Sequence, residues 1–275
     1  MTTFPPLPPI GPGLLLRALF KGASDASAPT EQVTHYTLPC IDAIAVRRYA
    51  DLMGFSANDL PITYYYLLAQ RAHMATMLGP QFPFRLAGMI HVENAICELL
   101  RPELALPMEL VTRVVVDPPA ERGARYCELL TVGSQREQSV FECRSRYLAV
   151  RGERRAGRER SGEPAEAAGE LKGEWSLSAQ AGRQYASVSG DWNPIHLWPW
   201  SARLLGMKAP IIHGMHSVAK ACALLEQAEG RRLSQVSAGF KSPILLGSHV
   251  ELRVAAPGEY QVWSGGKLAV EGGWH

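Results

Sequence analysis

Two turn-forming dipeptides hold an acid and a base close together between Tyr185 and His196, where the chain reads Y-A-S-V-S-G-D-W-N-P-I-H. Gly190-Asp191 and Asn193-Pro194 both favour tight turns. The loop therefore presents the Asp191 carboxylate and the His196 imidazole together, a pair suited to general acid and base catalysis. Either dipeptide alone is an ordinary surface turn, but the joint spacing G-D-x-N-P-x-H arises by chance in a chain of this length only about once in ten thousand times.

A second segment, P-I-I-H-G-M at Pro210 to Met215, follows closely. Together the two segments resemble the MaoC-like, or hydratase 2, members of the hot dog fold. In that family a Tyr precedes S/T-G-D-x-N-P-[apolar]-H, and H-G-M opens a long helix. The matching residues are Tyr185, Ser189-Gly190-Asp191, Asn193-Pro194-Ile195-His196 and His213-Gly214-Met215. The motif covers Tyr185 to Cys222, and the resemblance in fold extends over most of the chain.

The resemblance implies reversible hydration of trans-2-enoyl thioesters to (3R)-hydroxyacyl thioesters. Asp191 and His196 would activate one water, and the Gly214 N–H, free in the first turn of its helix, would bind the thioester oxygen. Asn193, Tyr185 and His213 would support the loop and the substrate. The resemblance implies neither a metal nor a redox cofactor, because the substrate itself carries coenzyme A or phosphopantetheine.

Several residues near the motif have simpler interpretations. Gly214 could merely allow close packing. His213 and His216 form H-x-x-H, but a zinc site needs further ligands that the following apolar helix does not offer. Cys222 lies where related hydratases often carry Ser, and we interpret it as a core thiol. Two sets of residues give weaker signals. Three bases could bind a phosphate of the substrate carrier: Lys241, Arg231 and Arg232. Three indoles could line the pocket: Trp192, Trp198 and Trp200.

The composition is that of an ordinary globular protein of 275 residues, with 47% hydrophobic and 20% charged residues. A formal net charge of +2 does not call for nucleic acid as a partner. The five cysteines lack a C-x-x-C pair and are expected to be thiols in a reducing compartment. The N-terminus has no basic region before its prolines, and no apolar run is long enough to span a membrane, so we expect a cytoplasmic protein.

The chain repeats itself. Tyr49-Ala50-Asp51-Leu52-Met53-Gly54 aligns with Tyr185 to Gly190, Pro61-Ile62-Thr63 with Pro194 to His196, and Ala87-Gly88-Met89 with His213 to Met215. In this alignment Phe55 and Thr63 replace Asp191 and His196, so the first copy has lost both proton carriers. Two copies in one chain resemble a double hot dog, an α+β fold in which two antiparallel sheets, each wrapped round a long central helix, join edge to edge. In similar hydratases the degenerate half makes room for the acyl chain.

The expected modules are an N-terminal arm docked on the fold at 1–32, a degenerate hot dog module at 33–150, a charged linker at 151–172, and the catalytic module at 173–275. In the first module we expect a strand at His35 to Leu38, helices at Ile41 to Met53 and Tyr64 to Met77, and a long helix from Gly88. Strands should follow at Met108 to Asp117, Ala124 to Gln135 and Ser139 to Val150. In the second, Ser178 should cap a helix through Val188, a long helix should start at Gly214, and strands should follow at Gln235 to Lys241, His249 to Ala255, Tyr260 to Ser264 and Lys267 to Gly272.

Two other functions remain open on the residues alone. A hot dog thioesterase would place its essential carboxylate on the central helix, where the acidic residues are Glu226 and Glu229, late in the helix. A non-catalytic acyl-thioester-binding or partner subunit would resemble the first copy, but the second copy keeps its proton carriers. The resemblance also allows a homodimer of the double module.

Overall fold

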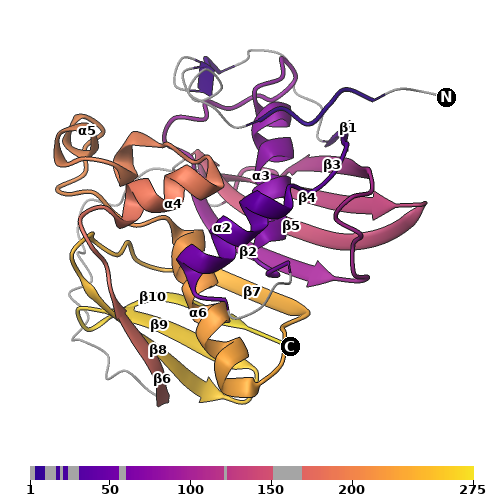
Figure 1. Ribbon diagram of the computed structural model, residues 1–275. Helices are drawn as coiled ribbons and strands as arrows, with labels where there is room; N and C mark the ends of the chain where they lie inside the picture. Colours follow the sequence, from indigo (N-terminus) through magenta and orange to yellow (C-terminus); the bar gives the residue numbers. More distant parts are fainter. Residues whose placement is uncertain are drawn as a thin grey trace. The chain divides into compact units, whose positions relative to one another are not determined.

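The computed structural model describes residues 4–9, 17–18, 21–23, 31–55, 60–120, 123–150 and 169–275. The chain divides into two compact units (Figure 1). The first comprises Met1–Ala43 and Tyr65–Arg160, and the second comprises Ile44–Tyr64 and Ser161–His275. The second unit therefore contains a helical segment from the N-terminal half of the chain.

The first unit is built on an antiparallel sheet in the order β1-β3-β4-β5-β2. Helix α3 (Tyr64–Met77) packs on this sheet, with Tyr65 stacked on Phe141 at 4.5 Å between ring centroids. Met77 at the end of the helix joins a buried apolar cluster with Val114 and Leu129 of the sheet. The strands are β1 (Glu31–Leu38), β2 (Ile90–Glu98), β3 (Met108–Val116), β4 (Arg125–Gln135) and β5 (Gln138–Val150).

The second unit is built on an antiparallel sheet in the order β6-β8-β9-β10-β7. Helix α6 (Gly214–Glu229) contacts β6, β7 and β10 and buries Met215, Val218 and Leu225. The strands are β6 (Glu170–Ser176), β7 (Gln235–Phe240), β8 (His249–Ala256), β9 (Glu259–Ser264) and β10 (Lys267–Gly273). The described residues of this unit also form helices α2 (Ala43–Met53), α4 (Ala181–Ser189), the short 3-10 helix η2 (Pro194–His196) and α5 (Pro199–Leu204).

The two sheets share one topology, because in each unit the strands follow the spatial order first, third, fourth, fifth, second. The aligned helices α2 and α4 also end alike. Gly54 and Gly190 both adopt left-handed backbone angles, with φ of 87° and 78°, a conformation that glycine adopts without steric cost. The predicted repeat from Tyr49 to Gly54 and from Tyr185 to Gly190 is thus confirmed.

The predicted long helix from Gly88 is wrong. Residues Ile90–Glu98 form strand β2, whose buried positions Asn94 and Ile96 alternate with more exposed ones. The long helix of the first copy is α3 instead. Thr63, immediately before α3, therefore corresponds to His213 before α6 rather than to His196, and Ala87-Gly88-Met89 does not correspond to His213-Gly214-Met215. A Gly-Met pair begins α6 and immediately precedes β2, so this pair does not distinguish a helix from a strand.

The other expected helices and strands are confirmed to within a few residues, with two exceptions. Strand β6 was not predicted, because its Glu170, Lys172 and Glu174 gave it the composition of the preceding linker. Helix α4 has Gln180 rather than Ser178 as its N-cap, although Ser178 Oγ accepts a hydrogen bond from the Gln180 N–H at 3.2 Å. Of the expected linker, 151–168 lie outside the described residues.

The described part of the N-terminal arm lies against the first unit. The Leu7 N–H donates to the Thr37 carbonyl oxygen at 2.7 Å, and the Thr37 N–H donates to the Pro5 carbonyl oxygen at 2.9 Å. Arg71 of α3 donates to the carbonyl oxygens of Leu7 and Pro8. The arm thus covers part of the free edge of β1.

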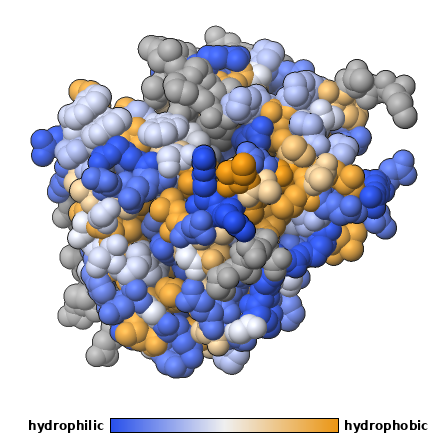
Figure 2. Space-filling model, viewed as in Figure 1, coloured by the Kyte–Doolittle hydropathy of each residue, from blue (hydrophilic) through white to orange (hydrophobic). Residues whose placement is uncertain are grey.

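Hydrophobic residues reach the surface in several places among hydrophilic ones (Figure 2). None of the helices in the described part of the chain is long and apolar enough to cross a bilayer.

Candidate active site

The loop after α4 holds the Asp191 carboxylate in a fixed position. Asp191 Oδ1 accepts a hydrogen bond from the Asn193 N–H at 3.1 Å, and the Asp191 N–H donates to Ser189 Oγ at 3.2 Å. Asn193 in turn caps η2, since its Oδ1 accepts from the Ile195 N–H at 3.3 Å. Such side-chain bonds to backbone N–H groups two residues along are typical of rigid Asx turns.

His196 is the last residue of η2 and is buried. Its Nδ1 lies 2.9 Å from the carbonyl oxygen of Ile211. Because a carbonyl can only accept, Nδ1 carries the proton, and the neutral ring keeps its lone pair on Nε2. Burial lowers the pKa of His196, while the charge of Asp191 and the bond to Ile211 partly oppose this shift. The imidazole is therefore neutral at pH 7 and can accept a proton.

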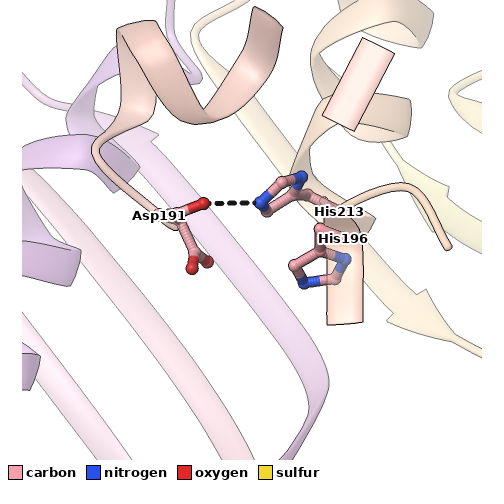
Figure 3. A group of neighbouring side chains, drawn as sticks. All are labelled: Asp191, His196 and His213. Carbon is pink, nitrogen blue, oxygen red and sulfur yellow. Dashed lines mark hydrogen bonds between the residues drawn. The ribbon is translucent and has the colours of Figure 1, made fainter. Parts of the chain in front are cut away.

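Asp191, His196 and His213 each offer one oxygen or nitrogen atom within 4.8 Å of the others. The Asp191 carboxylate and the His196 ring face a common space (Figure 3). His213 Nε2 lies 2.8 Å from the Asp191 carbonyl oxygen and donates to it. The rings of His213 and His196 stack with centroids 3.7 Å apart and 29° between their planes. His213 thus contacts both members of the acid–base pair.

The same three side chains could be considered as metal ligands. A bound ion lies in the plane of each ligating imidazole, about 2 Å from its nitrogen. Rings stacked face to face point their in-plane nitrogens in nearly parallel directions and cannot both reach one ion. His213 also uses Nε2 for the Asp191 carbonyl. The geometry fits a water held by Asp191 and His196 better than it fits a shared ion.

Gly214 is the first residue of α6, and His213 before it makes no side-chain cap. The N–H groups of a first helical turn have no intrahelical acceptor and lie at the positive end of the helix dipole. A Cβ at Gly214 would lie 2.6 Å from Cε1 of Phe240, so any side chain here would force that ring to move. The glycine keeps the helix start close to β7 and its backbone open to approach.

Gly182 of α4 was not predicted as a site residue, yet the loop depends on it. A Cβ at this position would overlap the backbone carbonyl oxygen of His196. Two further contacts hold the same loop: Arg183 Nη1 donates to the Leu197 carbonyl at 2.8 Å, and Ser201 Oγ donates to the Pro194 carbonyl at 2.6 Å. The sequence shows a Gly in a helix there, but only the fold shows what that Gly packs against.

Tyr185 is buried beside the histidines, with its ring centroid 4.9 Å from that of His213. Burial, Tyr49 and Asp191 raise its pKa well above the ordinary value, so the hydroxyl stays protonated. Tyr49, its counterpart in the first copy, lies 6.4 Å away between ring centroids and donates to Thr63 Oγ1 at 2.9 Å. The first copy therefore supplies part of the buried surroundings of the site within the second unit.

Other candidate residues make contacts that do not involve the Asp191–His196 pair. Trp198 and Trp200 are 38% and 62% exposed, and that these two indoles and Trp192 line a pocket stays a prediction. Ser201 and Ala202 are the residues of α5 that turn inward, which leaves both indoles outside. Lys241 pairs with Glu271 at 2.7 Å, and Cys222 is fully buried. Arg232 Nη2 donates to the Leu60 carbonyl at 2.6 Å.

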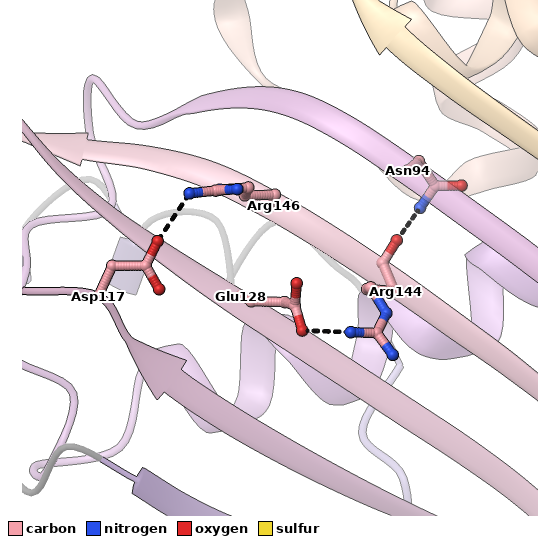
Figure 4. A network of polar contacts seen from close by, with 5 residues as sticks. All are labelled: Asn94, Asp117, Glu128, Arg144 and Arg146. Carbon is pink, nitrogen blue, oxygen red and sulfur yellow. Dashed lines mark hydrogen bonds and ion pairs between the residues drawn. The ribbon is translucent and has the colours of Figure 1, made fainter. Parts of the chain in front are cut away.

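Polar contacts among the described residues of the first unit link different parts of its sheet. Arg144 pairs with Glu128, and Arg146 pairs with Asp117, each at 2.7 Å (Figure 4). Asn94 Nδ2 donates to the Arg144 carbonyl at 3.2 Å and ties β2 to β5. The Arg144–Glu128 pair and the Asn94 bond link adjacent strands, whereas Asp117 follows β3, which β4 separates from β5.

Comparison with known proteins identifies the family to which the chain belongs. The family model of the MaoC like domain matches residues 163–270. The 3-hydroxyacyl-thioester dehydratase X of Mycobacterium tuberculosis is 31% identical over 236 residues, which cover 82% of this chain and 81% of that protein. The chain belongs to the MaoC-like dehydratase family. Membership confirms the expected resemblance and the expected hydro-lyase class.

Solved structures agree with membership of the MaoC-like dehydratase family. The crystal structure of HtdX from M. tuberculosis superposes with a TM-score of 0.68 at 27% identity, covering 87% of this chain and 98% of that one. A conserved M. tuberculosis protein said to have a double hotdog fold superposes with a TM-score of 0.58 at 12% identity, covering 92% and 97%. The predicted double hot dog fold is confirmed.

Proposed function

We propose that this MaoC-like dehydratase reversibly adds water to trans-2-enoyl thioesters to give (3R)-hydroxyacyl thioesters. The observation that carries the proposal is the pair of groups facing one space: the Asp191 carboxylate, fixed by the Asn193 N–H, and the neutral His196, whose Nε2 is left as a proton acceptor. The similarity to a protein named 3-hydroxyacyl-thioester dehydratase supports this reaction class.

The hydration step uses one water held between the two side chains. His196 Nε2 accepts a proton from this water as its oxygen bonds to C3 of the substrate. The Asp191 carboxylate orients the water and stabilises the imidazolium that forms. The proton then passes from His196 to C2, so the elements of water are added across the double bond and the enzyme returns to its starting state. Dehydration is the reverse sequence.

Negative charge develops on the thioester oxygen when water attacks C3. The Gly214 N–H, at the uncapped start of α6, is the donor that we assign to this oxygen. His213 is adjacent in sequence to Gly214 and contacts Asp191 and His196, which couples the start of the helix to the acid–base pair. The reaction needs no group besides these residues and the thioester carried on coenzyme A or phosphopantetheine.

The experiment follows the loss of conjugated enoyl absorbance with crotonyl-CoA and a medium-chain trans-2-enoyl-CoA. Wild type is compared with Asp191→Asn and His196→Ala, and with Asp51→Asn on the exposed side of α2 as the matched control. Removing either member of the pair should lower kcat/KM by about 10²–10⁴-fold, the usual contribution of a positioned acid or base. The control should keep the wild-type rate. Retained activity in either site variant, with the fold intact, would exclude the assigned role.

The thioesterase alternative finds no support on α6. Glu226 Oε1 accepts from the Leu233 N–H at 3.1 Å, and Glu229 is exposed at the end of the helix. Both carboxylates lie at the opposite end of α6 from Gly214. The same assay separates the non-catalytic alternative, because an acyl-binding subunit would bind the enoyl thioester without consuming it.

A further inference from the structure

Four large hydrophobic side chains lie exposed around α5. Trp198, Trp200, Leu204 and Leu205 are 38%, 62%, 78% and 47% exposed, and we call them the α5 surface. The two indoles stack with centroids 5.9 Å apart and 13° between their planes, so their rings lie nearly parallel beside one another. Large apolar side chains that are exposed together often mark a binding surface, whereas single exposed apolar residues are common and need no explanation.

The α5 surface is attached directly to the catalytic loop. Trp198 is two residues from His196, and α5 packs on η2. Ser201 Oγ donates to the Pro194 carbonyl at 2.6 Å, which fixes the base of α5 to the residue that begins η2. Figure 1 shows α5 beyond α4, away from the sheet of the second unit. A partner bound at the α5 surface would therefore sit near His196 without covering the sheet.

The charged residues that lie near the α5 surface in the sequence, apart from Asp191 of the candidate site, are basic. No Asp or Glu occurs between Trp192 and Leu225. Arg203 and Lys208 are exposed, and the Arg183 guanidinium lies 5.8 Å from the Trp198 ring. Exposed tryptophans beside arginines are typical of the residues that dominate protein–protein binding energy. Complementarity of charge with these bases favours an acidic partner.

We propose that the α5 surface docks an acidic acyl carrier protein that delivers the substrate on its phosphopantetheine arm. This inference rests on the proposed function and selects between its two thioester carriers. Small ligands such as coenzyme A bind in concave sites that bury most of their surface. The α5 surface projects outward and suits a protein instead. An amphipathic membrane contact would need a longer basic helix than α5 provides.

The kinetic test compares three crotonyl thioesters: of an acidic acyl carrier protein, of coenzyme A, and of N-acetylcysteamine. The variants are Trp200→Ser/Leu204→Ser and Arg203→Glu. The matched control is Leu171→Ser, which removes a leucine of β6 that is 46% exposed. Each test variant should lose about tenfold or more in kcat/KM on the carrier protein thioester, mainly through KM, a loss of about 1.4 kcal/mol in binding. Rates on the two small thioesters should stay within about twofold. These substrates carry no protein that could contact the α5 surface, so they gain no binding energy from it.

Two outcomes overturn the docking proposal: an equal loss on all three thioesters, or no loss on the carrier protein thioester. Calorimetric titration of crotonyl-loaded carrier protein tests docking without turnover, and the test variants should lose binding that Leu171→Ser keeps. If wild type hydrates none of the three thioesters, the proposed function fails, and the titration still decides the docking. If wild type instead sediments with phosphatidylglycerol vesicles and both test variants do not, the surface binds membranes and the proposal is wrong.

Discussion

His213 donates a hydrogen bond from Nε2 to the backbone carbonyl oxygen of Asp191 across 2.8 Å. The same ring stacks on His196 at 3.7 Å. Burial, His196 and His216 hold the pKa of His213 well below its ordinary value, so the ring is neutral and repels no charge that forms on His196. One neutral side chain thus positions both groups to which we assign proton transfer.

Replacing His213 should therefore slow catalysis without removing a reacting group. His213→Ala is expected to lower kcat by about 10²-fold, because misplacing a catalytic group by about 1 Å has an effect of this size. KM should change little. His213→Gln offers an amide N–H to the Asp191 carbonyl and should recover part of the loss. Steady-state kinetics of the three proteins check this, and an Ala variant with wild-type kcat would remove the positioning role.

The pH dependence of hydration should follow the neutral form of His196. Burial lowers its pKa below the ordinary 6.5. Neutral imidazole is the active form, so kcat/KM should be constant near pH 7 and fall as the pH drops through a midpoint below 6.5. The Asp191 charge raises the pKa of His196, so the residual activity of Asp191→Asn should have a lower midpoint still. A midpoint above 6.5, or an upward shift in Asp191→Asn, would conflict with His196 as the proton acceptor.

Gly182→Ala should disturb the catalytic loop from the side of α4. The added methyl group would overlap the His196 carbonyl oxygen, so either α4 or η2 must move. We expect about 1–3 kcal/mol of destabilisation from overpacking. The loss of kcat should be about 10²-fold from the displaced imidazole. Gly239→Ala is the control, because its Cβ meets only contacts of 3.6 Å or longer. Urea unfolding and kinetics of both variants test this, and similar behaviour of the two would show that the loop tolerates the displacement.

Metal removal should leave the activity unchanged. Asp191, His196 and His213 lie close enough together to be considered as ligands, but the two stacked rings cannot both point at one ion. Dialysis against EDTA, followed by assay in metal-free buffer, should preserve the hydration rate. A loss that Zn²⁺ restores would replace the water-based mechanism with a metal-based one.

The turns that position Asp191 and His196 could be predicted from the sequence because they depend on residues close together in the chain. Gly190-Asp191 and Asn193-Pro194 form their turns through contacts within a few residues, and the structure shows those contacts. Strands β3, β4 and β5 of the first unit were also predictable, since alternation of buried and exposed positions, as in β3, is a local pattern. The double hot dog fold followed from the repeat and from the family motif.

Features that depend on distant parts of the chain were not predictable in the same way. Gly182 faces the His196 carbonyl only after α4 and η2 have packed together. The exposure of Trp198 and Trp200 could not be predicted from their closeness in sequence to the motif, because it depends on the orientation of α5. The segment after Gly88 became a strand because it pairs with β5, a partner far along the chain.

The central claim is that Asp191 and His196 act on one shared water, and a double-mutant cycle tests it most directly. Hydration of crotonyl-CoA is measured for Asp191→Asn, His196→Gln and the double variant, with folding checked by circular dichroism. Groups that act as one unit show strongly non-additive losses. The account predicts that the double variant is no slower than the slower single variant. Losses that multiply would mean that the two side chains act independently, and would contradict the shared water.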